Sequence, residues 1–202
     1  MPRTLAQALS YFLHPALFPI LGVLFILKMA PFTYDSHVVI ITILMVFIGT
    51  YLIPLLISFL LLRMGLIHTM HMHHASERKI PYLVTALSFM LTASSILELG
   101  LLPQVHLFLW GSALVIVVHL VMLFYSKPSA HLAGIGGFTG LVVALSLQYQ
   151  LNLLPLLMLS IFLSGMLASA RYALGAHTLA ELGVGFLTGA VLVGGVVFLF
   201  TG

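Results

Sequence analysis

The chain has 202 residues, of which 62% are hydrophobic and only 5% are charged. A soluble domain carries roughly 25% charged residues, so seven Lys/Arg and four Asp/Glu are too few to cover a soluble fold of this size. No basic block suits a nucleic-acid backbone, and the absence of cysteine excludes disulfides, thiolate catalysis and cysteine metal sites.

Long apolar runs recur along the whole chain and indicate membrane spans. Lipid requires every backbone polar group to be paired internally, so spans are helices or closed barrels. Barrel strands alternate apolar and polar residues over about ten positions, whereas these runs have the helix length of about 18 to 25 residues. We therefore expect an all-α, polytopic helical bundle forming a single domain over 1–202. The expected spans are 8–29, 38–62, 81–102, 106–125, 132–149, 153–172 and 177–200.

The first apolar run lacks the small-residue cleavage site of a signal peptide, so we expect it to be a retained span. Counting the spans then places the N-terminus and loops 63–80, 126–131 and 171–176 on one membrane face. Most cations lie on that face, namely Arg3, Arg63, Arg78, Lys79, Lys127 and Arg171, whereas Lys28 and Asp35 lie near the other. The positive-inside rule makes the charged face cytoplasmic, although ligand binding is a second reason for cations to gather there.

Three short segments on this face carry most of the polar side chains: 71–81, 127–131 and 169–181. Lys and Arg at helix ends commonly reach lipid headgroups without any further role. Taken together, however, the segments bring cations and histidines to one end of a small bundle, where anionic oxygens would be stabilised. Arg171 offers planar bidentate donors to a phosphate, and Lys127 adds a point charge. Ser129 and backbone N–H groups of the following helix can add neutral donors.

His177 and Glu181 are spaced i, i+4 at the start of the last predicted span, so they share one helix face. A carboxylate there can keep one imidazole nitrogen as N–H and leave the lone pair of the other free to attack. His131, at the start of another predicted helix, is placed to protonate a leaving oxygen.

These residues resemble the type 2 phosphatidic acid phosphatase (PAP2) superfamily. Pro128-Ser129-Ala130-His131 looks like the P-S-G-H motif of that family, and Arg171-x5-His177-x3-Glu181 looks like its S-R-x5-H-x3-D motif. The two motifs occur in the family's order and on the same predicted membrane side. The resemblance is best over roughly residues 120–195, and the whole chain looks more loosely like short bacterial members.

The resemblance implies a PAP2-like core and a phosphatase that needs neither a metal nor another cofactor. His177 would be the nucleophile that forms a phosphohistidine, Glu181 would orient it, and His131 would be the general acid. Arg171 and Ser129 would bind the phosphate. The implied substrate is a lipid phosphate, and the implied location is the bacterial inner membrane, where members of the family mostly act on the outer face.

The chain departs from the family's pattern at several positions. Ala130 stands in place of glycine, Ala170 in place of serine, and Glu181 in place of aspartate. Of the first motif, K-x6-R-P, only Arg78-Lys79-Ile80-Pro81 is present, with His73 near the position of the lysine. Two predicted spans separate this fragment from the second motif, so Arg78, Lys79 and Lys127 are candidates for the remaining phosphate ligands without a residue-level match.

Two other functions remain open. His71, His73, His74 and Glu77 could supply imidazole and carboxylate ligands to a metal in a metal-binding or metal-transporting protein. A non-catalytic lipid-binding or channel-like protein would also use intramembrane polar residues, for which Glu98 and His119 are candidates. The substrate is open too, because phosphatidic acid, phosphatidylglycerol phosphate and prenyl diphosphates all combine a phosphate with an apolar tail.

Overall fold

The computed structural model describes residues 1–31, 33–69 and 75–200. Every regular element in these ranges is helical, as the apolar runs predict. The α-helices are α1 (Arg3–Phe12), α2 (Phe18–Met29), α3 (Ser36–Phe47), α4 (Ile53–Arg63), α5 (Lys79–Glu98), α6 (Pro103–Met122), α7 (Ala130–Gln148), α8 (Leu154–Ala173) and α9 (Leu179–Phe200). Three short elements, η1 (Pro15–Leu17), η2 (Ile48–Leu52) and η3 (Ala75–Arg78), adjoin them.

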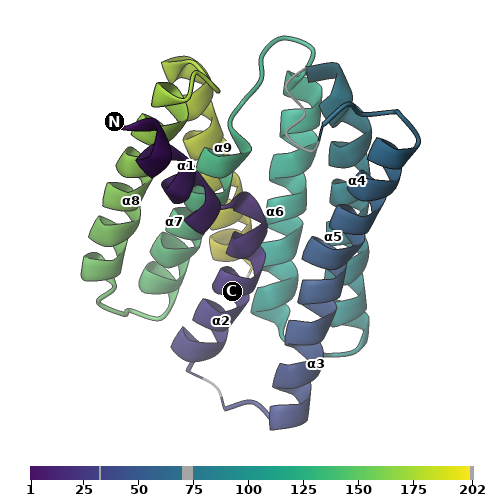
Figure 1. The fold of residues 1–202 in the computed structure, drawn as a ribbon. Helices are drawn as coiled ribbons and strands as arrows, with labels where there is room; N and C mark the ends of the chain where they lie inside the picture. Colours follow the sequence, from purple (N-terminus) through teal and green to yellow (C-terminus); the bar gives the residue numbers. More distant parts are fainter. Residues whose placement is uncertain (32, 70–74, 201–202) are drawn as a thin grey trace.

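Seven stretches of the described chain are long and apolar enough to cross a membrane. They are Arg3–Met29, Ser36–Arg63, Ser76–Glu98, Pro103–Met122, Ala130–Gln148, Leu154–Ala173 and Leu179–Phe200. These are the seven predicted spans with their ends shifted by a few residues, which confirms the polytopic α-helical bundle. Figure 1 shows the helices side by side, with the α6–α7 and α8–α9 connections at the same end. The chain is therefore an integral membrane protein.

Proline divides the second span into two helices. The backbone widens into a single π-helical turn, η2, where the Ile53 N–H bonds the Ile48 carbonyl. The next residue, Pro54, has no N–H to continue this pattern onto the Gly49 carbonyl. The Ser88 hydroxyl of α5 donates to that carbonyl instead, at 2.5 Å. A neighbouring helix thus satisfies the group that proline leaves unpaired, as expected for proline within a membrane bundle.

Glycines bring α7 and α9 into backbone contact at the centre of the bundle. A Cβ added to Gly189 would lie 2.2 Å from the carbonyl oxygen of Ala133. A Cβ added to Gly185 would lie 2.5 Å from the carbonyl oxygen of Ser129, the N-cap residue of α7. Small residues permit such close approach in membranes, where packing rather than the hydrophobic effect drives helix association. The contact fixes the first turn of α7 directly against α9.

Candidate functional site

The connection between α8 and α9 sets the position of Arg171 relative to His177. Gly175 has φ +65°, a left-handed conformation that glycine adopts without strain. Its N–H bonds the Tyr172 carbonyl, and the following Ala176 N–H bonds the Arg171 carbonyl at 3.1 Å. This pair of bonds ends α8 in a Schellman turn. The five residues between Arg171 and His177 are therefore the last turn of a helix and its glycine cap.

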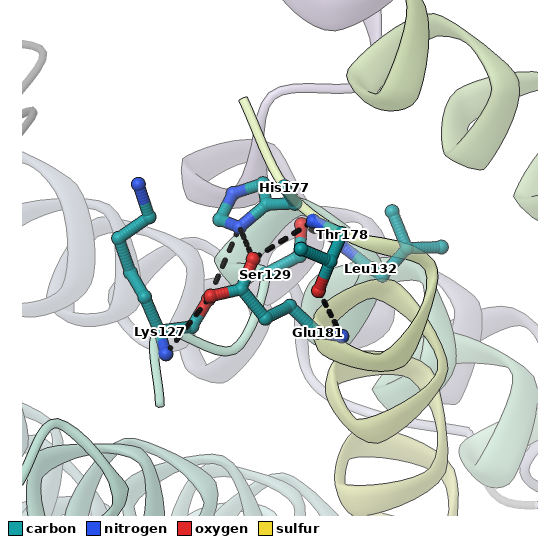
Figure 2. A network of polar contacts seen from close by, with 6 residues as sticks. All are labelled: Lys127, Ser129, Leu132, His177, Thr178 and Glu181. Carbon is teal, nitrogen blue, oxygen red and sulfur yellow. Dashed lines mark hydrogen bonds and ion pairs between the residues drawn. The ribbon is translucent and has the colours of Figure 1, made fainter. Parts of the chain in front are cut away.

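A capping box begins α9 immediately after His177. The Thr178 hydroxyl accepts from the Glu181 N–H at 3.3 Å, and the Glu181 carboxylate accepts from the Thr178 N–H at 2.8 Å (Figure 2). The T-x-x-E pattern of a capping box is visible in the sequence and signals this role for Glu181, a role that its i, i+4 spacing from His177 does not reveal. A carboxylate is also favourable at a helix N-terminus, because it faces the positive end of the helix dipole.

Glu181 also joins α9 to the α6–α7 connection. Its other carboxylate oxygen accepts from the Lys127 backbone N–H at 3.2 Å, and its backbone carbonyl accepts from the Ser129 N–H at 3.1 Å. Figure 2 shows these groups gathered around the start of α9. The second and third predicted segments are thus joined into one site by main-chain hydrogen bonds.

A backbone carbonyl fixes the tautomer of His177. Its Nδ1 lies 3.1 Å from the Lys127 carbonyl oxygen, and a carbonyl can only accept a hydrogen bond. Nδ1 therefore carries the proton, and in the neutral ring Nε2 carries the lone pair. The Glu181 carboxylate lies 3.7 Å from Nδ1, within ion-pair distance but beyond hydrogen-bond distance. The closest partner of the ring is thus a carbonyl, with the predicted carboxylate second.

His177 is neutral at physiological pH. The pKa of its imidazole is lowered from 6.5 to about 4, chiefly by burial and then by the charges of Arg78, Arg171 and Lys127. The Glu181 carboxylate opposes these effects and raises the pKa. Three cations, from η3, α8 and the α6–α7 connection, therefore act on one buried imidazole, which keeps its lone pair available.

His131 and Arg171 meet at the N-terminal helix. A guanidinium N–H of Arg171 donates to the Ser10 hydroxyl of α1 at 3.3 Å, and the His131 ring lies beside the Ser10 backbone. The Arg171 Nε–H is buried and has no hydrogen-bond partner in the part of the chain that the structure describes. The ring of His14 lies edge-on to the His131 ring, with centroids 5.5 Å apart. Neither Ser10 nor His14 was predicted, because nothing in the local pattern of the first span marks them.

The remaining predicted phosphate ligands are placed differently from one another. Arg78 lies close enough to act electrostatically on both Arg171 and His177, and its side chain also interacts with Tyr82. Lys79 is exposed, and its ammonium lies 4.5 Å from the centre of the Phe124 ring in a cation–π contact. Ser129 is fully buried, and its hydroxyl caps α7 by accepting from the Leu132 N–H at 3.4 Å.

His119 and Glu98, the candidates for a lipid-binding or channel-like protein, lie apart from each other. His119 is buried beneath the site, with Nε2 2.8 Å from the Thr188 hydroxyl. That hydroxyl donates to the Val184 carbonyl, so it accepts from the imidazole and ties α6 to α9. Glu98 is exposed at the opposite end of α5.

For the metal alternative, His71, His73 and His74 lie outside the described residues, and Glu77 pairs with His68 at 2.5 Å. Within the described ranges no group of three or more His, Cys, Asp or Glu side chains is arranged to hold a metal ion.

Comparison with protein-family models, with curated proteins and with solved structures gives no match to this chain.

Proposed function

We propose that this integral membrane protein is a lipid phosphatase that hydrolyses a phosphomonoester or diphosphate through a phosphohistidine on His177. The observation that carries the proposal is the state of that imidazole. Its Nδ1 proton is held by the Lys127 carbonyl, its ring is neutral, and the charges of three cations act on it. A neutral nucleophile with cations close by is what attack on a phosphate anion requires.

In the first step, Nε2 of His177 attacks phosphorus and the bond from phosphorus to the lipid oxygen breaks. Charge on the transferring phosphoryl oxygens is stabilised by Arg171, Arg78 and Lys127. The departing oxygen takes a proton from His131 in its imidazolium form. Bound phosphate favours that form, because an anion nearby stabilises the charged imidazole against burial.

In the second step, water attacks the phosphorus of phosphohistidine. The neutral His131 takes a proton from that water, the P–N bond breaks, and His177 regains its lone pair. Inorganic phosphate and the dephosphorylated lipid are the products. The proton given in the first step is recovered in the second, so each turnover consumes one water and needs no oxidant or reductant.

The proposed substrate is amphiphilic, because the cationic site lies at the end of an otherwise apolar bundle. Its phosphate would occupy the site and its tail would remain in lipid. Phosphatidic acid, phosphatidylglycerol phosphate and prenyl diphosphates meet this requirement. The proposed location is the bacterial inner membrane, and membership of the type 2 phosphatidic acid phosphatase superfamily rests on the two motifs around His131 and His177.

A second candidate is a non-catalytic anion- or lipid-binding protein on the same scaffold. The capping role of the Ser129 hydroxyl favours it, because that hydroxyl already serves the first turn of α7. Binding alone needs the cations but not the acid.

Phosphate release by the purified full-length protein from a panel of lipid phosphates, with EDTA present, tests the proposal. The wild type is expected to release phosphate from at least one lipid, and His177→Ala is expected to release none. His37→Ala is the matched control, because His37 is an exposed imidazole at the start of α3, at the other end of the bundle. Release that survives His177→Ala contradicts the mechanism, and absence of release together with phosphate binding favours the second candidate.

A further inference from the structure

We propose that His14 is a phosphate-contacting residue, so that the N-terminal helix supplies a wall of the anion site. The inference rests on the proposed function for its substrate, but it concerns anion binding and can be tested without turnover. Neither motif includes the first span. The argument depends on what that span contacts and on which nitrogen of His14 is free.

Ser10 connects α1 to both halves of the site. Its hydroxyl donates to the Ala6 carbonyl at 2.8 Å and accepts from the Arg171 guanidinium at 3.3 Å. Its backbone lies beside the His131 ring. Figure 1 shows α1 packed beside α8 at the end where α8 turns into α9. One serine of the first span thus bonds Arg171 and lies next to His131, the two residues proposed to handle the phosphate.

The chain breaks its helix just after Ser10 and turns His14 toward these residues. His14 precedes Pro15 and is extended, with φ −67° and ψ 136°, as expected for a residue before proline. Its ring lies edge-on to His131 and feels the charge of Arg171. The break between α1 and α2 therefore places a third histidine beside the proposed acid and the proposed phosphate ligand.

The free nitrogen of His14 is a donor. Its Nδ1 accepts from the Ala16 N–H at 3.3 Å, so Nδ1 carries a lone pair. In the neutral ring the proton is therefore on Nε2, which has no hydrogen-bond partner among the described residues. The Arg171 Nε–H, buried nearby, also has none. An unpaired buried donor on Arg171 and an exposed donor on His14, which interact electrostatically, can both donate to a bound anion.

Two substitutions separate this role from a structural one. In His14→Asn the side-chain oxygen can still accept from the Ala16 N–H, but the donor at the Nε2 position is lost. In His14→Gln the amide N–H reaches about as far as Nε2, while the cap on η1 is weakened. A residue that only caps η1 tolerates asparagine, and a residue that donates to phosphate tolerates glutamine. His37→Asn is the control for replacing an exposed imidazole by an amide.

The experiment measures the dissociation constant of inorganic phosphate for the purified full-length protein in detergent. His14→Asn is expected to weaken binding by about 10- to 100-fold, the effect of losing one hydrogen bond to a charged group. His14→Gln and His37→Asn are expected to stay within about threefold of the wild type. If the variants show this pattern of binding while the wild type hydrolyses no lipid, the assignment of His14 stands and the phosphatase proposal is rejected. Unchanged binding in His14→Asn, equal loss in both His14 variants, or a wild type that binds no phosphate overturns the inference.

Discussion

Main-chain groups organise the histidine site at the scale of single residues. The Lys127 carbonyl holds the Nδ1 proton of His177, and the two oxygens of Glu181 are occupied by backbone N–H groups of Thr178 and Lys127. Glu181 therefore acts on His177 mainly by holding together the two loops that surround it, and secondarily by its charge at 3.7 Å. This arrangement accommodates glutamate where the family pattern has aspartate, since the longer side chain reaches the first turn of its own helix.

Glu181→Gln should therefore reduce stability and activity together. The amide keeps one acceptor oxygen and places an NH₂ group against one of the two backbone donors, so we expect the free energy of unfolding to fall by about 1–3 kcal/mol. Activity should fall less than in His177→Ala, because the Lys127 carbonyl still fixes the tautomer. Thermal unfolding and phosphate release measure the two effects. Glu98→Gln, at an exposed glutamate, is the control, and equal behaviour of the two variants would contradict the role of Glu181.

His177 should titrate far below an ordinary histidine. Its pKa in the folded protein is about 4, so the neutral ring contributes stability that is complete above pH 6.5 and is lost as the pH falls toward 4. Nitrogen NMR of ¹⁵N-histidine-labelled protein, assigned with His177→Gln, should show this ring neutral at pH 5.5. Inorganic phosphate should raise the pKa, because the bound anion stabilises the imidazolium. A midpoint near 6.5 without phosphate would show that the ring is neither buried nor surrounded by cations.

The contact between α7 and α9 positions the site at the scale of whole helices. Gly185 lies against Ser129, and the Glu181 carbonyl accepts from the Ser129 N–H one turn earlier on α9. The start of α7, which carries His131, is thus fixed to the start of α9, which follows His177. A change in the spacing of these two helices would alter the distance between the proposed nucleophile and the proposed acid.

Gly185→Ala tests this contact with a control on the same helix. The added Cβ would lie 2.5 Å from a backbone oxygen, so α7 and α9 must separate, whereas a Cβ on Gly183 meets nothing within 4 Å. We expect Gly185→Ala to lower stability by about 1–3 kcal/mol and to reduce activity. Gly183→Ala should leave both unchanged or slightly raise stability, since alanine favours helix. Similar unfolding temperatures and activities for the two variants would contradict the packing.

The whole molecule is strongly asymmetric in charge. Arg78, Lys127 and Arg171 act on the site, while Arg3, Arg63 and Lys79 at the same end are exposed. Near the opposite end the exposed charges are Lys28, Asp35 and Glu98. When Arg78, Lys127 and Arg171 are left out of the count, the end that holds the site still carries more Lys and Arg than the opposite end.

The positive-inside rule therefore predicts that the site faces the cytoplasm. The chain contains no cysteine, so single cysteines report topology without a background. Tyr125→Cys lies on the exposed α6–α7 connection, and Ser36→Cys lies on the exposed start of α3 at the other end. In intact cells a membrane-impermeant maleimide should label Ser36→Cys and reach Tyr125→Cys only after lysis. The reverse pattern would place the site outside, where most members of the family act.

Hydropathy predicted the architecture, because the length of a span is set by the thickness of the lipid. Motif spacing predicted that the α6–α7 and α8–α9 connections would meet, since a helix end and its glycine cap occupy a fixed number of residues. Motif spacing did not predict that Arg78 acts on the site while Lys79 is exposed. Neighbouring helical residues point about 100° apart, and only packing decides which of them lies toward the site. It also missed Ser10 and His14, because the register of α1 against α8 depends on contacts between residues far apart in sequence.

The most direct measurement of the central claim is capture of the covalent intermediate. Purified full-length protein is mixed with a hydrolysable lipid phosphate in EDTA, quenched in alkali within the first turnover, and digested for mass spectrometry, because phosphohistidine survives alkali. A phosphoryl group on His177, which forms more slowly in His131→Ala because that variant lacks the proposed acid, is the result that this mechanism predicts. Phosphate release with no modified His177 at any time point, or release that requires a divalent metal, would contradict it.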